Sequence, residues 1–179
     1  IYPQEWQHDF AAARNKSYSK TTGDWIMWLD ADDVMDASFN VMNLEPKFPI
    51  LKPLAEQLDT LPSDIGCVWL PYLYSDNLPM KIPRLVRRSA GPWVWRNAVH
   101  EELVSESPIT PAWTILNTPA IKHAPVQSET ARQSRNVEIM DRELKDQAKR
   151  TPWLLYHRAR AYESDGFSAA AVDMYLEAL

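Results

Sequence analysis

The stretch that decides the fold is GDWIMWLDADD, at residues 23–33. Its centre, residues 25–29, is a continuous run of large apolar side chains, which is typical of a short strand buried on both faces. Three carboxylates follow at the end of this run, those of Asp30, Asp32 and Asp33. A buried strand that leads directly into an acidic loop indicates an α/β fold, because open α/β sheets bind ligands at the carboxyl ends of their strands.

The sequence on both sides extends this α/β pattern. Residues 6–20 predict a helix, and Gly23 follows its basic last turn as a stop signal. Further elements are predicted as a short helix within residues 51–61 and as strands at residues 67–74, 81–88, 113–116 and 120–123.

The character of the chain changes near Ser128. Apolar side chains spaced as on one helical face are Val137, Met140, Leu144 and Ala148. Two more helices are predicted, one that starts at Pro152 and one over residues 167–179. We therefore expect an α/β domain over residues 1–125 and an all-α segment over residues 126–179.

Composition excludes several classes of protein. Of the 179 residues, 45% are hydrophobic and 24% charged, which is typical of a globular protein. The net charge of −5 argues against a nucleic-acid partner. No apolar run reaches the roughly 20 residues that a membrane span needs. The single cysteine, Cys67, leaves no internal disulfide and favours a reducing compartment, so the predicted location is cytoplasmic.

Two further features limit the interpretation. Only 4 glycines are present, which argues against a glycine-rich phosphate loop. The sequence opens at Ile1 without a methionine and ends at Leu179 within a predicted helix, so we expect a fragment that is truncated at both ends.

The acidic loop is the strongest candidate site. Three carboxylates close together repel one another unless a cation offsets them, and a hard divalent cation such as Mn²⁺ or Mg²⁺ takes oxygen ligands. The simpler alternative is a solvated turn in which Asp33 caps a helix at residues 35–39.

Together with DFAAARN at residues 9–15, the stretch at residues 23–33 resembles the core of family 2 glycosyltransferases with the GT-A fold. The resemblance implies a Rossmann-like nucleotide-diphospho-sugar transferase domain that lacks its first nucleotide-binding strands. It also implies a nucleotide-sugar donor bound through Mn²⁺ or Mg²⁺. Asp32 would be the metal ligand, Asp30 would face the ribose or the metal, and Asp33 would be an accessory position in cofactor binding.

A second block resembles the acceptor side of bacterial members of this family. It consists of PRLVRR at residues 83–88, WVW at residues 93–95 and VHEEL at residues 99–103. The resemblance implies that Glu101 is the general base of an inverting reaction; the alternative is an acid placed in the first turn of a helix. His100 would order this loop or contact the phosphates.

Other residues of the resemblance have equally open interpretations. His123 would complete the metal shell, or would simply be packed in the core. Arg84 and Arg88 would share a face and neutralise the leaving diphosphate, with Arg87 on the opposite face. The tryptophans of residues 93–95 would stack on a sugar or belong to the core.

The helical segment resembles the start of a tetratricopeptide repeat, in which small and aromatic side chains interlock two antiparallel helices. The matching positions are Ala159, Tyr162, Gly166, Ala171, Tyr175 and Ala178. Such repeats follow the GT-A domain in some bacterial glycosyltransferases, which implies contact with a protein partner or a homodimer through the tail.

The leading hypothesis is therefore a metal-dependent, inverting transfer of sugar to an acceptor hydroxyl or peptide side chain, the acceptor being a glycan, a peptide or a small molecule. One alternative is a non-catalytic protein-binding scaffold built from a GT-A remnant and tetratricopeptide-like helices. A nucleotidyltransferase would use the same acidic strand end, but it does not explain His100 and Glu101.

Overall fold

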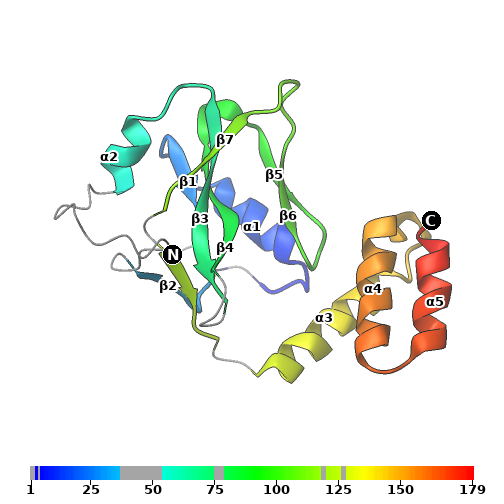
Figure 1. Ribbon diagram of the computed structural model, residues 1–179. Helices are drawn as coiled ribbons and strands as arrows, with labels where there is room; N and C mark the ends of the chain where they lie inside the picture. Colours follow the sequence, from blue (N-terminus) through cyan, green and yellow to red (C-terminus); the bar gives the residue numbers. More distant parts are fainter. Residues whose placement is uncertain (1–2, 4, 37–53, 75–78, 118–119, 126–127) are drawn as a thin grey trace. The chain divides into compact units, whose positions relative to one another are not determined.

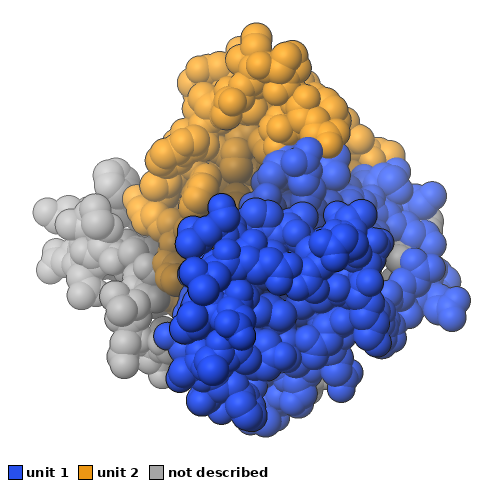
Figure 2. All heavy atoms as spheres, turned by 90° about the vertical axis from the view of Figure 1, so that its right-hand side faces the viewer, with its two compact units in different colours: residues 1–20, 94–104, 127–179 blue, residues 21–93, 105–126 orange. Residues whose placement is uncertain are grey.

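The computed structural model of the protein describes residues 3, 5–36, 54–74, 79–117, 120–125 and 128–179 (Figure 1). The chain divides into two compact units, which Figure 2 colours separately. Unit 1 comprises residues 1–20, 94–104 and 127–179, and unit 2 comprises residues 21–93 and 105–126. These units follow spatial contacts and each draws on separate parts of the sequence, whereas the predicted boundary at residue 125 divides the sequence once.

Two short helices and eight strands precede three α-helices at the end of the described chain. In order they are α1 (Phe10–Tyr18), β1 (Trp25–Met27), β2 (Asp33–Asp36), α2 (Leu54–Asp59), β3 (Ile65–Leu73), β4 (Pro79–Arg87), the 3-10 turn η1 (Arg88–Ala90), β5 (Trp93–Arg96), β6 (Glu102–Ser105), β7 (Ala112–Ile115), β8 (Ala120–His123), α3 (Glu129–Glu143), the 3-10 turn η2 (Gln147–Lys149), α4 (Pro152–Ser164) and α5 (Ser168–Glu177). The predicted α/β fold with a helical C-terminal segment is confirmed.

Unit 2 is built on a mixed sheet. Its described strands follow the order β1-β4-β3-β8-β2. The strands β3 and β4 pair antiparallel, as do β1 with β4 and β2 with β8. Two strands run parallel to β3, with β7 beside residues 65–69 and β8 beside residues 72–73. This arrangement brings the end of β8 beside the start of β2, which is where the acidic loop lies.

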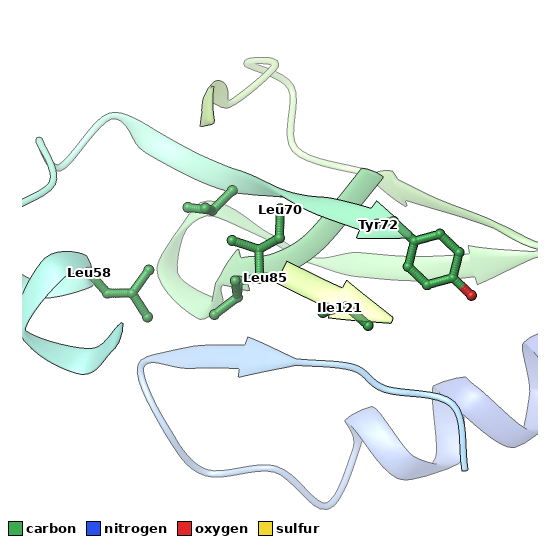
Figure 3. Packing of buried hydrophobic residues seen from close by; sticks show 6 residues of the cluster. Leu58, Leu70, Tyr72, Leu85 and Ile121 are labelled. Carbon is green, nitrogen blue, oxygen red and sulfur yellow. The ribbon is translucent and has the colours of Figure 1, made fainter. Parts of the chain in front are cut away.

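The core of unit 2 forms on one face of this sheet (Figure 3). Val68, Leu70 and Tyr72 of β3 are buried because alternate side chains of a strand point to the same face. They pack with Leu85 of β4, Ile121 of β8 and Leu58 of α2. The predicted strands at residues 67–74, 81–88 and 120–123 therefore supply this core.

Two local predictions differ from the structure. The apolar run at residues 25–29 forms a strand only over β1, where Ile26 is buried, and Leu29 is 42% exposed. The strand ends at Met27, although the Trp28 amide still donates to the Arg84 carbonyl at 3.2 Å, and the turn of the acidic loop is closed by the bond from the Asp33 amide to the Asp30 carbonyl. Residues 33–36 form β2 rather than the start of a helix, because they pair with β8, and residues 37–39 lie outside the described residues.

In unit 1, helix α1 is fixed to the β5–β6 hairpin. Asp9 caps the helix by accepting a hydrogen bond from the amide of Ala12 at 2.8 Å. The Phe10 amide donates to the Ala98 carbonyl at 2.8 Å. These two contacts account for the first residues of the DFAAARN motif.

The helices α4 and α5 form an antiparallel pair (Figure 1). Pro152 occupies the first turn of α4, as predicted, and Thr151 caps the helix. The turn between the helices contains Gly166 at a φ of 81°, a conformation that favours glycine. Ala159 and Ala171 are buried, which allows the close helix contact expected at these positions. Helix α3 ends at Glu143, so Ala148 lies in η2 and does not continue its face.

Candidate active site

The acidic loop is a tight turn held by its own hydrogen bonds. The Asp33 amide donates to the Asp30 carbonyl, and the Asp30 amide donates to Oδ2 of Asp33, both at 3.0 Å. Strand pairing places Asp33 opposite His123, and the Ala124 amide donates to the Asp32 carbonyl at 2.7 Å. The loop is therefore fixed against the end of β8.

This arrangement gathers three metal-ligating groups. One side-chain donor atom each from Asp32, Asp33 and His123 lies within 4.8 Å of the others. The His123 Nδ1 is 3.9 Å from Oδ1 of Asp32 and 3.7 Å from Oδ1 of Asp33. Two carboxylates and one imidazole form a donor set that could hold a divalent metal ion. Asp30, also predicted as a metal ligand, is not part of this group.

The Asp33 side chain is the most enclosed of the three. The Arg84 Nη1 lies 2.9 Å from its Oδ2, and both side chains are buried. The Tyr72 hydroxyl donates to Oδ1 at 3.2 Å. Burial, followed by the nearby Asp33 carboxylate, raises the pKa of Tyr72, so the hydroxyl keeps its proton and remains a donor. Asp32, in contrast, has a side chain that is 27% exposed.

The predicted arginines bind groups of the protein itself. The Arg84 guanidinium stacks on the ring of Trp28, 3.7 Å from its centroid, and is 1% exposed. A side chain so buried has no surface to offer a diphosphate, so the structure gives Arg84 a different partner from the predicted one. Arg87 donates to the Ile65 carbonyl, and Arg88 donates to the Gly23 carbonyl at 2.8 Å and remains near the surface.

The predicted base lies in unit 1. Oε1 of Glu101 is 2.8 Å from Nε of Arg14, and both side chains are largely buried. The next residue of α1, Asn15, exchanges two hydrogen bonds of 2.8 Å with the backbone of Trp95. Helix α1 thus orients the Glu101 carboxylate and holds the strand that precedes its loop.

The remaining predicted residues of this block also have defined positions. His100 has a φ of 52° and its ring stacks on that of His157. Trp95 is buried, with Tyr18 edge-on to it, and the indole of Trp93 donates to the Arg87 carbonyl at 2.9 Å. Trp95 therefore belongs to the core, as the alternative interpretation has it.

Several contributing residues had no role in the sequence prediction. Arg14 and Asn15 lie inside the DFAAARN motif, which is the signal that could have identified them. Tyr72 continues the alternation of buried residues in β3, but nothing in that pattern points to Asp33. His157 lies in the tail, far in sequence from His100, and only the fold brings the two rings together.

A cavity of about 420 Å³ lies between α1, the β5–β6 turn and the start of α4. Its walls include Asp9, Asn97, Lys149 and the indole of Trp153. Lys149 pairs with Glu143, and this contact raises the pKa of the lysine. The cavity therefore combines an aromatic wall with charges of both signs.

Comparison with known proteins identifies the N-terminal region. Residues 1–41 match the family model described as Glycosyl transferase family 2. This part of the chain is thus similar to family 2 glycosyltransferases. The match includes α1, β1 and the acidic loop, so the predicted family is supported on the residues that contain Asp32 and Asp33 but not on those that contain His123.

The chain is also similar to larger proteins along most of its length. It is 28% identical over 158 residues to the SPbeta prophage-derived glycosyltransferase SunS of Bacillus subtilis, and the alignment covers 86% of this chain and 35% of that protein. It is 28% identical over 167 residues to a TPR repeat-containing protein of Synechococcus elongatus, covering 88% and 36% respectively. The chain thus spans about a third of the length of these relatives.

Among the described residues, no helix combines the length and apolar character that are needed to cross a membrane.

Proposed function

We propose that this chain is the part of a metal-dependent, inverting glycosyltransferase that contains its metal site and its general base. The observation that carries the proposal is the group formed by Asp32, Asp33 and His123, whose two aspartates lie in the region that matches family 2. The similarity to a glycosyltransferase along 86% of the chain supports the same activity. The donor is a nucleotide sugar and the acceptor a glycan, a peptide or a small molecule.

The metal site would hold Mn²⁺ or Mg²⁺. When bound, such an ion acts as a Lewis acid that stabilises negative charge on phosphate oxygens. Asp32 is the proposed principal ligand because its carboxylate is the most accessible of the three groups, and His123 is the proposed nitrogen ligand. Asp33, neutralised by Arg84, would hold the turn in place. Asp30 would then bind the ribose of the donor. Arg88 would bind oxygens of the donor diphosphate.

Glu101 is the proposed general base. It takes the proton of the acceptor hydroxyl while the acceptor oxygen bonds to the anomeric carbon. The bond from that carbon to the diphosphate breaks, and the nucleoside diphosphate leaves with the electron pair. Attack opposite the leaving group inverts the anomeric centre. Arg14 supports this role because its Nε lies 2.8 Å from Oε1 of Glu101 and so holds the carboxylate in one orientation.

A protein partner or a second copy of the chain would bind through the tail. The tetratricopeptide-like pattern, the α4–α5 pair and the similarity to a TPR repeat-containing protein support this. Val172 and Leu176, four residues apart on α5, are 53% and 65% exposed. This apolar surface also favours the alternative of a non-catalytic scaffold, which requires no metal.

The experiment is a metal dependence measurement on the full-length protein. Hydrolysis of a panel of nucleotide sugars, which needs no identified acceptor, would be followed by release of nucleoside diphosphate. We expect release with at least one donor in Mn²⁺ or Mg²⁺, its loss in chelator and its recovery on adding the metal back. Release that is indifferent to chelator would contradict the metal-dependent mechanism, and no release with any donor would favour the scaffold.

A further inference from the structure

The loop that carries Glu101 is packed into the helical part of unit 1. Val99, two residues before Glu101, is 4% exposed and belongs to one buried cluster with Ile139 and Met140 of α3. Leu154 and Ala161 of α4 pack against the same cluster. The β5–β6 turn therefore shares a core with the helices near the end of the chain.

His100 connects this core to the proposed base through an unusual backbone conformation. Its φ of 52° lies in the left-handed region, which residues other than glycine rarely adopt without compensating contacts. Its ring lies nearly parallel to that of His157 on α4, with centroids 4.2 Å apart and an interplanar angle of 13°. The rings of Trp153 and Tyr156 also contact the His157 ring, with centroid distances of 4.5 and 5.3 Å.

The position of Glu101 depends on this conformation. Glu101 directly follows His100, so a change in the His100 backbone would redirect the carboxylate. Arg14 holds the far end of the same carboxylate from α1. The side chain is thus fixed at its tip by Arg14 and at its base by the backbone of His100.

We propose that His157 is a positioning residue for Glu101, because its ring stacks on His100 and keeps that residue in the left-handed conformation. Through this contact helix α4 helps to position the proposed general base. The tail then has a second role besides the binding of a partner. This role of His157 in catalysis rests on the proposed function, in which Glu101 is the general base. The contact itself, and the coupling it predicts, do not depend on that role.

The charge state of the pair is consistent with stacking. Burial lowers the pKa of His100, which Glu101 acts to raise and Arg160 to lower. Burial, together with His100 and Arg160, lowers the pKa of His157 to about 4. Both rings are therefore neutral near pH 7 and stack without repulsion.

Hydrogen exchange in the full-length protein tests the coupling without any ligand. In His157→Ala, amides of residues 97–104 should exchange about two- to tenfold faster, the factor that corresponds to one aromatic pair. His157→Phe keeps a ring and should restore the slow exchange. Tyr162→Ala is the control, because it removes another ring of α4, one that contacts Arg158 and Phe167. This change should leave the exchange rates of residues 97–104 unaltered.

Two results would overturn the proposal: unchanged exchange in His157→Ala, or equal acceleration in Tyr162→Ala. If His157→Ala loses its far-ultraviolet helical signal, His157→Gln replaces it, with the same expected result. Catalysis provides the second readout. His157→Ala should lower kcat about tenfold or more at unchanged donor KM, and His157→Phe should restore it.

The two proposals fail in different ways. If Glu101→Gln leaves the transfer rate unchanged, Glu101 is not the base, whereas the exchange result still decides the contact with His157. If Glu101→Gln abolishes transfer and His157→Ala changes neither exchange nor kcat, the role of Glu101 stands and that of His157 is wrong.

Discussion

Removal of the Arg84 guanidinium tests whether the acidic loop depends on a buried ion pair. Arg84→Met keeps much of the length of the side chain but leaves the Asp33 carboxylate, which has no exposed surface, without its cation. Breaking a buried pair from one side costs about 3–5 kcal/mol. The Tyr72 hydroxyl and the Asp30 amide still donate to Asp33, so we expect the lower end, about 3 kcal/mol.

Urea unfolding, followed by circular dichroism, measures this loss. Adding Asp33→Asn should recover a large part of it, because the second change removes the unpaired charge. Lys149→Met is the matched control: it breaks an exposed pair with Glu143 and should cost less than about 1 kcal/mol. A loss below about 1 kcal/mol in Arg84→Met, or no recovery in the double variant, would refute the reasoning.

Three further changes have defined outcomes. Ala171→Trp should overpack the α4–α5 contact, where Ala171 is 2% exposed, and lower the free energy of unfolding by about 1–3 kcal/mol; an unmoved thermal midpoint would mean that these helices pair differently. The pKa of His157 falls from its usual 6.5 to about 4 in the folded protein, so the unfolded chain takes up the proton first. The stability that neutral His157 contributes is therefore complete above pH 6.5 and decreases as the pH falls towards 4, whereas a pH series of melting curves for His157→Phe should lack this component. Glu101→Gln should lower the transfer rate by about 10²–10⁴ at saturating donor while Glu102→Gln, on an exposed side chain, does far less; the reverse order would contradict the assignment of the base.

The elements predicted from the sequence are those whose signals are local. The strand at residues 67–74, the helix that starts at Pro152 and the helix that follows Gly166 each depend on a few neighbouring residues, and each is present in the structure. The apolar run at residues 25–29 is different. Its composition is that of a buried strand, but the strand ends at Met27 ahead of the acidic loop, and composition does not encode where the strand ends.

The candidate site was predictable only in part for a related reason. The resemblance predicts Asp32, Asp30 and His123 as metal ligands, but the pairing of β2 with β8 brings Asp33 rather than Asp30 into the group with Asp32 and His123. The burial of Arg84 likewise depends on the rings of Trp28 and Tyr72, which come from separate elements. An arginine near an acidic motif suggests a phosphate ligand from the sequence alone, and only its burial identifies it as a partner of Asp33.

Binding of Mn²⁺ to the full-length protein, measured by the enhancement of water-proton relaxation, tests the central claim most directly. Asp32→Asn preserves the shape of the partly exposed ligand and removes its charge, and Asp24→Asn makes the same change at an exposed acid that is not part of the group. We predict that Asp32→Asn weakens Mn²⁺ binding at least about tenfold and that Asp24→Asn leaves it unchanged. Equal Mn²⁺ affinity in the unaltered protein and in Asp32→Asn would contradict the assignment of this loop as the metal site.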